Sequence, residues 1–262
     1  MATSPFATWP PLNKAPVCGR CPSIFGLGHQ KSGTTTVLFA LGSAANLTVN
    51  YDMTGFWLEP DLSDHEVCKA LDPNAVIQKA GHAWKYVAAL KSICPTTALY
   101  VVKRNALDVI RSVADRLQLH AGEGCEDSLG GIPKGWQPLF RYSNDTSCLV
   151  RLAASVVHMA RTLATEAPEA PRIQYEDYVK APTSAIGALC ASLGVECNAT
   201  RLDVSQKQRK GKHHGVNAST LWPATYVKRI RAVLDHPRAP EQVRALRAGG
   251  ADMHRQSRRA RS

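Results

Sequence analysis

Residues 23–36 read SIFGLGHQKSGTTT. The apolar run at 24–27 is typical of a buried strand, and the pattern from about Thr34 to Ser43 is typical of a helix. Between them lies a turn rich in glycine and serine. A strand, a tight turn and a helix N-terminus direct backbone N–H groups and the helix dipole at one point, which suits a phosphate group. Lys31 adds a positive charge at that point.

This loop differs from the loop that binds ATP or GTP in kinases. The kinase loop places its lysine directly after the second glycine. Here Thr34 follows Gly33, and Lys31 lies two positions before that glycine. An ordinary ATP or GTP loop is therefore disfavoured. A nucleotide or small-molecule kinase and a non-catalytic nucleotide-binding protein remain as alternatives.

Strand and helix patterns alternate along the chain after the loop. Further strands are expected at 75–79, 97–102 and 172–175, and further helices at 84–93, 105–119, 147–165 and 179–193. Such alternation predicts an α/β fold of three layers, in which a central, mostly parallel sheet has helices on both faces. One domain over 22–248 is expected. It would lie between a proline-rich arm (1–21) and a basic, disordered tail (249–262).

A second cationic segment follows the strand expected at 97–102. Arg104 stands at the carboxyl end of this strand, where open α/β sheets bind their ligands. Ser112 follows about two helical turns later, on nearly the same helix face. An arginine and a hydroxyl group placed in this way can hold a second phosphate.

Four motifs, taken in their order along the chain, resemble one known family. They are Lys-Ser-Gly-Thr-Thr at 31–35, Arg-Asn-x-x-Asp-Val-x-x-Ser at 104–112, Gln-Tyr-Glu-Asp-Tyr at 174–178 and Arg-Lys-Gly at 209–211. The chain resembles the sulfotransferases that use 3′-phosphoadenosine 5′-phosphosulfate (PAPS). In that family the first motif is the phosphosulfate loop, and the second binds the 3′-phosphate.

The resemblance implies a role for each matching residue. Those expected to hold the 5′-phosphosulfate are Lys31, Ser32, Gly33, Thr34 and Thr35. Those expected at the 3′-phosphate are Arg104, Ser112, Arg209, Lys210 and Gly211, with Tyr175 near the adenine. The implied reaction moves the sulfuryl group of PAPS to a hydroxyl or amine of a small-molecule or carbohydrate acceptor and releases PAP. It needs no metal, and Lys31 stabilises charge on the leaving oxygen.

The reaction also needs a base to take the proton of the acceptor. His82 is the predicted catalytic base, because it follows the strand expected at 75–79 and an imidazole titrates near neutral pH. A carboxylate, Asp52 or Glu59, is the alternative, and Lys79 is a further residue expected near the transferred group. The acceptor pocket is expected to include 51–62, His82 and residues 121–142 of the long loop at 120–146.

Composition limits the partners of the chain. The net charge is +11, yet residues 1–206 hold 18 basic and 18 acidic side chains, so the whole surplus lies in 207–262. A protein that coats nucleic acid uniformly is therefore disfavoured, and no specific nucleic-acid partner is expected. No stretch approaches the roughly 20 apolar residues of a membrane span. A homodimer is left open.

Cysteines and glycosylation sequons bear on the cellular compartment. The eight cysteines are dispersed through a chain large enough to build a core, so no disulfide framework is required. Cys18 and Cys21 could form half a zinc site, but no second pair stands at a matching spacing. The first sixteen residues lack an apolar signal region, which favours the cytoplasm. Four Asn-x-Ser/Thr sequons, at Asn46, Asn144, Asn198 and Asn217, keep a secretory lumen as the alternative.

Overall fold

The computed structural model describes Cys18 and residues 21–51, 62–72, 74–119, 125–202 and 222–235. Its centre is a five-stranded sheet in the order β2-β3-β1-β4-β5. The strands are β1 (Ile24–Leu27), β2 (Val49–Tyr51), β3 (Ile77–Lys79), β4 (Ala98–Lys103) and β5 (Arg172–Gln174). Every pairing between them is parallel. The predicted α/β fold with a central parallel sheet is confirmed.

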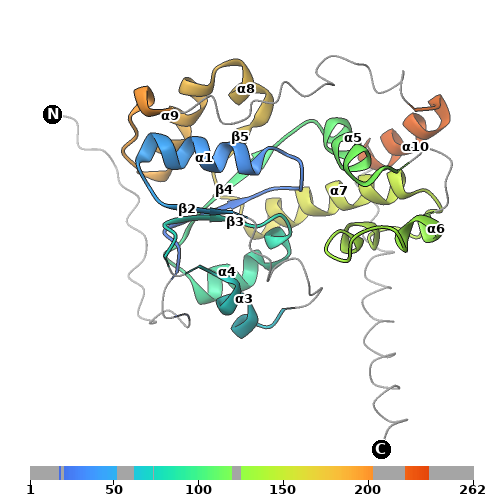
Figure 1. Cartoon of the computed structure of the whole chain (residues 1–262), viewed down its shortest axis with the longest axis horizontal. Helices are drawn as coiled ribbons and strands as arrows, with labels where there is room; N and C mark the ends of the chain where they lie inside the picture. Colours follow the sequence, from blue (N-terminus) through green and yellow to red (C-terminus); the bar gives the residue numbers. More distant parts are fainter. Residues whose placement is uncertain are drawn as a thin grey trace, which may run out of the picture.

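Helices cover both faces of this sheet (Figure 1). One face carries α1 (Thr34–Ala45), α8 (Tyr175–Lys180) and α9 (Pro182–Leu193). The other face carries α3 (Asp64–Ala70), the 3-10 helix η1 (Ala83–Tyr86), α4 (Val87–Ile93) and α7 (Cys148–Glu166). Beside α7 pack α5 (Ala106–Leu117), α6 (Cys125–Leu129), η2 (Gln137–Phe140) and α10 (Ala224–Asp235). A third 3-10 turn, η3, spans Ala199–Arg201.

Alternating side chains of the strands build the two layers of the core. In β4, Tyr100 and Val102 face α1 and α9, whereas Leu99 and Val101 face α4 and α7. All four are at most 7% exposed, because both faces of a parallel sheet are covered by helices. This two-sided burial explains why 98–103 reads as a continuous apolar run instead of an alternating one.

Several elements differ from their expected bounds. The helix predicted at 179–193 is two helices, α8 and α9, because Pro182 lacks the N–H that would continue the first one. Proline is instead well placed in the first turn of α9. The strand β2 and the helices α3, α6 and α10 were not predicted; β2, α3 and α6 are short segments, which give little periodic signal.

Four disulfides pair all eight cysteines. They are Cys18–Cys68, Cys21–Cys94, Cys125–Cys148 and Cys190–Cys197. The dispersed spacing in the sequence did not predict this pairing. Three pairs join residues that are 23 to 73 positions apart, and Cys190–Cys197 closes a short loop. The Cα–Cα separations lie between 4.6 and 6.2 Å, which is ordinary disulfide geometry.

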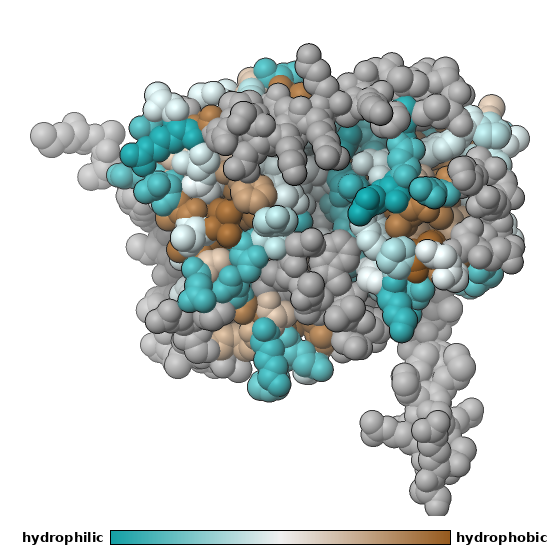
Figure 2. Space-filling view, in the orientation of Figure 1, coloured by the Kyte–Doolittle hydropathy of each residue, from teal (hydrophilic) through white to brown (hydrophobic). Residues whose placement is uncertain are grey.

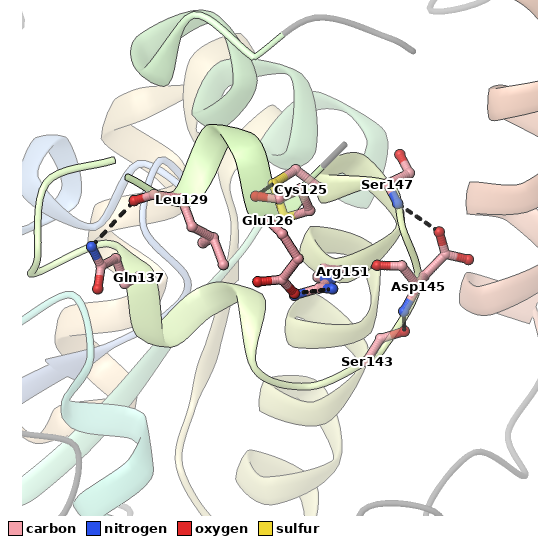
Figure 3. Close-up of a disulfide and its surroundings, with 9 residues drawn as sticks. Cys125, Glu126, Leu129, Gln137, Ser143, Asp145, Ser147 and Arg151 are labelled. Atoms are coloured by element: carbon pink, nitrogen blue, oxygen red, sulfur yellow. Dashed lines mark hydrogen bonds and ion pairs between the residues drawn. A yellow bond between two sulfur atoms is a disulfide. The ribbon is translucent and has the colours of Figure 1, made fainter. Parts of the chain in front are cut away.

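The predicted loop at 120–146 is anchored over its described part (Figure 3). The Cys125–Cys148 disulfide joins α6 to the start of α7. Next to it, Arg151 Nη2 lies 2.6 Å from the Glu126 carboxylate. The backbone N–H of Ser147 donates to the Asp145 carboxylate at 2.8 Å. These contacts fix both ends of the segment, which brings Trp136 to the site described below.

The described surface is mixed in character. In Figure 2, hydrophobic residues reach the surface in separate areas bordered by hydrophilic ones. Tyr51, 49% exposed, is the exposed large hydrophobic residue of the described ranges. Within those ranges, no helix combines the length and the apolar character that crossing a bilayer requires.

Candidate functional site

Two side chains contact the backbone of the loop between β1 and α1: His29, which belongs to the loop, and Arg104, which directly follows β4. His29 Nδ1 lies 2.9 Å from the carbonyl oxygen of Gln30, and Arg104 Nη1 donates to the carbonyl of Lys31 at 2.9 Å. Lys31 has a φ of 65° and Gly33 a φ of 96°. Gly33 is the N-cap of α1 and has no side chain to cap the first amides of the helix. These amides and the helix dipole therefore suit an anion.

Gly33 is required at its position for two reasons. Its φ of 96° lies in the region that disfavours residues with a Cβ atom. A Cβ atom there would also overlap the ring of Tyr175. The loop and the aromatic ring that begins α8 are thus in close contact, as a site shared by the first and third sequence motifs requires.

The first cavity, named here the loop cavity, has a volume of about 210 Å³. Its lining residues are Gln30, Lys31, Gly33, Thr34, Thr35, Tyr51, Lys79, Gly81 and Trp136. It therefore combines the N-terminus of α1 with two lysines, Lys31 and Lys79. Lys79 ends β3 and pairs in register with Gly26 of β1, which places it beside the loop. Both lysines can neutralise an anion bound at the helix N-terminus.

Arg104 connects the loop to the second sequence motif. Besides its hydrogen bond to Lys31, its guanidinium carbon lies 5.1 Å from the centre of the Tyr175 ring, which is a cation–π contact. The Nε atom of Arg104 is buried without a hydrogen-bond partner. Arg104 and Tyr175 therefore lie against the backbone of the loop, although Lys31 lines the loop cavity and Arg104 lines a second cavity.

The carboxylate of Glu176 lies near Arg104. Glu176 accepts the N–H of Asn105 at 2.8 Å and also binds the Gln174 side chain. Partial burial raises the pKa of Glu176, but these hydrogen bonds outweigh the burial and leave the pKa below its usual value. Asn105 in turn caps α5 through the N–H groups of Leu107 and Asp108. The charged Glu176 therefore fixes the start of α5 next to Arg104.

The predicted base, His82, lies in the interior. It is 1% exposed, and its Nε2 lies 2.8 Å from the carbonyl oxygen of Gly135 and 2.5 Å from the Gln30 side-chain amide. Burial, with a smaller contribution from Lys85, lowers the pKa of His82 to about 3. A hydrogen bond to the Gly135 carbonyl requires a proton on Nε2, whereas the Gln30 NH2 group requires a lone pair there, so the neutral ring makes one of these two bonds at a time. A base role for His82 stays a prediction.

His29 is a residue of the loop to which the sequence reasoning gave no role. Burial lowers its pKa to about 4. The ring is therefore neutral near pH 7, with Nδ1 donating to the Gln30 carbonyl. Its Nε2 lies 2.9 Å from the Ser155 hydroxyl on α7, which itself donates to the Leu152 carbonyl. His29 therefore connects the loop to α7. Its position within residues 23–36 was the sequence signal that could have identified it.

Other predicted residues lie apart from the loop cavity or outside the described residues. Ser32 is 1% exposed and lines a second cavity. Ser112 is half-buried on α5. Phe140, an aromatic in the loop expected at the acceptor pocket, is 1% exposed and packs in the core. Those outside the described residues are Asp52, Glu59, Arg209, Lys210, Gly211 and the tail at 249–262.

Comparisons with known proteins found matches among solved structures. A sulfotransferase from Alicyclobacillus acidocaldarius matches 84% of this chain and 98% of its own, at 14% identity and a TM-score of 0.43. The sulfotransferase domain of the curacin biosynthetic pathway matches 77% of this chain and 83% of its own, at 19% identity and a TM-score of 0.43. Sulfotransferases are thus among the structures that this chain matches, as its motifs predict.

A third match is retinol dehydratase in complex with androsterone and the inactive cofactor PAP. It covers 79% of this chain and 69% of its own, at 15% identity and a TM-score of 0.39. No protein-family model and no curated protein sequence matches the chain.

Proposed function

We propose that this protein transfers the sulfuryl group of PAPS to a hydroxyl or amine of an acceptor and releases PAP. The hydrogen bond between Arg104 and the Lys31 carbonyl, 2.9 Å long, is the observation that carries the proposal. It makes the phosphate loop and the arginine of the second motif neighbours in one site. A nucleotide with phosphates at both ends of its ribose needs this arrangement of two cationic groups.

The residues present suit such a nucleotide. Arg104 Nε, buried without a partner, offers a donor for a 3′-phosphate. The Tyr175 ring lies between Gly33 and the Arg104 guanidinium, where it can pack against the nucleoside. Lys31, Thr34 and Thr35 line the loop cavity, where the 5′-phosphosulfate would lie over the first turn of α1. Arg209, Lys210 and Gly211 are proposed to add to the 3′-phosphate site, together with Ser112.

Catalysis in this site would come from position and charge. As in phosphoryl transfer, the reacting groups must be held in line while developing negative charge is neutralised. Lys31 would stabilise the charge on the oxygen that links the sulfuryl group to the leaving nucleotide. Lys79, from the opposite wall of the loop cavity, would neutralise the sulfuryl oxygens. Tyr51 and Trp136 would contact the acceptor, whose small-molecule or carbohydrate nature is part of the proposal.

His82 is proposed first as a positioning residue. Its contacts connect the phosphate loop, through Gln30, to the segment that carries Trp136, through Gly135. If His82 is also the base, the acceptor hydroxyl must replace Gly135 as the partner of Nε2. Asp52 and Glu59 are the alternative bases.

Binding and transfer experiments test the proposal. PAP, AMP and ATP with Mg²⁺ are titrated in turn into the protein by calorimetry. We expect PAP to bind at least about tenfold more tightly than AMP, because only PAP reaches Arg104 with a phosphate. Equal binding of AMP and PAP would contradict the 3′-phosphate site, and tightest binding of ATP with Mg²⁺ would favour a kinase. Transfer of radiolabelled sulfate from PAPS to a library of alcohols, amines and sugars then tests the reaction.

We also propose that the chain folds in an oxidising compartment, in place of the expected cytoplasm. Disulfides are rare in reducing compartments, and four of them pair all the cysteines here. The three sequon asparagines in the described residues, Asn46, Asn144 and Asn198, are exposed. Peptide mapping without reduction, before and after removal of N-glycans, tests this. Alkylated free cysteines in the native protein would contradict it.

A further inference from the structure

A second cavity lies beside the phosphate loop, under helix α7. Its volume is about 590 Å³, which is within the range of pockets that hold small organic ligands. We name it the α7 cavity. Its walls are the carboxyl half of β4, the start of α5 and one face of α7, and His29 and Ser32 of the loop also line it. It is distinct from the loop cavity, although Arg104, which is proposed to bind the 3′-phosphate, lines it.

The α7 wall is a continuous apolar stripe. Its lining residues, at three- and four-residue spacing, are Val156, Met159, Ala160, Leu163 and Ala164. Val156, Met159 and Leu163 are at most 8% exposed, whereas Ala160 and Ala164 are exposed. Two small side chains thus stand at the mouth of the cavity, where larger residues would close it. Val101 of β4, whose side chain faces α7, provides an apolar wall on the opposite side.

The end of the cavity nearest the loop is different in character. Ser32 is 1% exposed, and its hydroxyl is buried without a hydrogen-bond partner. Arg104 Nε is also buried without a partner, and Arg104 lines the same cavity. A Cβ atom added at Gly28 would lie 2.8 Å from the Ser32 hydroxyl oxygen and 2.9 Å from the Val102 carbonyl oxygen, so these two oxygens lie close to the same point. The Ser32 hydroxyl therefore lies at the end of β4, two residues before Arg104.

Unsatisfied buried donors favour a ligand that accepts hydrogen bonds. The charges that line this cavity are cationic and come from Lys103, Arg104 and Arg172. The nearby carboxylate of Glu176 is already engaged by Asn105 and Gln174. An anionic group is therefore favoured over a cationic one at this end.

We propose that the α7 cavity binds an amphiphile with one apolar chain and an anionic head group, of the fatty-acid type. The chain would lie along the α7 stripe, and the carboxylate would accept hydrogen bonds from Ser32 and Arg104. This binding does not depend on the proposed function. One consequence does depend on it: a fatty acid and PAP would compete for Arg104, so the amphiphile would weaken PAP binding.

The test uses dodecanoate below its micelle concentration, titrated into the full chain by calorimetry without any nucleotide. The variant Ala160→Trp fills the mouth of the cavity, and Ala188→Trp places the same side chain at an exposed position of α9, on the other face of the sheet. We expect Ala160→Trp to lose at least about tenfold in dodecanoate affinity, because the indole occupies the room of several methylene groups. Ala188→Trp should bind dodecanoate like the natural chain.

Charge and folding controls complete the test. Dodecylamine, with the same chain and the opposite charge, should bind at least about tenfold more weakly than dodecanoate. Lys103→Glu should weaken dodecanoate and strengthen dodecylamine, and thermal unfolding checks that each variant is folded. The proposal is overturned if the natural chain does not bind dodecanoate, if Ala160→Trp binds it unchanged, or if dodecylamine binds equally well. PAP binding is measured separately: a chain that binds dodecanoate but not PAP would count only against the proposed function, whereas PAP that binds without weakening dodecanoate would count against Arg104 as the contact of the carboxylate.

Discussion

Replacing Arg104 by alanine should separate the two ends of the proposed nucleotide site. The Arg104 guanidinium donates a hydrogen bond to the Lys31 carbonyl of the loop at 2.9 Å, and its Nε atom is buried without a hydrogen-bond partner. A hydrogen bond to a charged group contributes about 1.5–3 kcal/mol, so losing the 3′-phosphate contact should weaken PAP binding about 10- to 150-fold. AMP lacks that phosphate. Its binding should fall only about 2- to 10-fold, through the loosened loop.

The assay is calorimetric titration of PAP and AMP into three proteins. They are the natural chain, Arg104→Ala and the control Arg116→Ala, which removes an exposed arginine from α5. Arg104→Lys should fall between the natural chain and Arg104→Ala, because an ammonium keeps the charge but not the fork of donors. If PAP and AMP lose the same factor in Arg104→Ala, the arginine only supports the loop. The 3′-phosphate assignment would then be refuted.

Three further predictions concern stability and the base. The free energy of unfolding should fall as the pH drops from about 6.5 towards 4, because burial holds the pKa of His29 at about 4 and unfolding lets the ring take up a proton. Urea unfolding at several pH values should show this loss, and an equal loss in His29→Gln would count against it. Removing the Cys125–Cys148 disulfide by a double serine substitution should lower the free energy of unfolding by about 3 kcal/mol, from the entropy of the opened loop. An unchanged urea midpoint would contradict that. The variant His82→Gln keeps a donor for the Gly135 carbonyl but offers no catalytic base. Near-natural turnover of this variant would support a positioning role for His82. A loss of about 100-fold or more in turnover, with an altered pH profile, would support its role as the base.

The sequence predicted the phosphate loop and the place of Arg104 for a physical reason. Both depend on residues adjacent in the chain: a strand, a turn with glycine at its end, and a helix that begins at once. Parallel strands bring their carboxyl ends to one edge of the sheet, and the pairing of β1 with β4 in the structure makes the loop and Arg104 neighbours along that edge. The hydrogen bond between Arg104 and the Lys31 carbonyl agrees with that expectation.

The interior position of His82 could not be predicted in the same way. Its partner Gly135 lies 53 residues away, in a segment that the sequence presented only as a loop. The position of His82 after the expected strand suggested a catalytic base, but the burial of its imidazole depends on the residues that pack against it in the folded chain. The low pKa follows from that packing, so a residue chosen for titrating near neutral pH has a pKa of about 3 in the folded chain.

By itself, the sequence determined the α/β class, the order of most strands and helices along the chain, and the glycine-containing loop between the first strand and the first helix. These depend on local patterns of side chains and on the geometry of consecutive residues. The tertiary structure decided which cysteines pair, that Lys79 lines the same cavity as Lys31, and that Ser32 and Arg104 line a second cavity. Each of these depends on contacts between segments that are apart in the chain and meet only when it is folded.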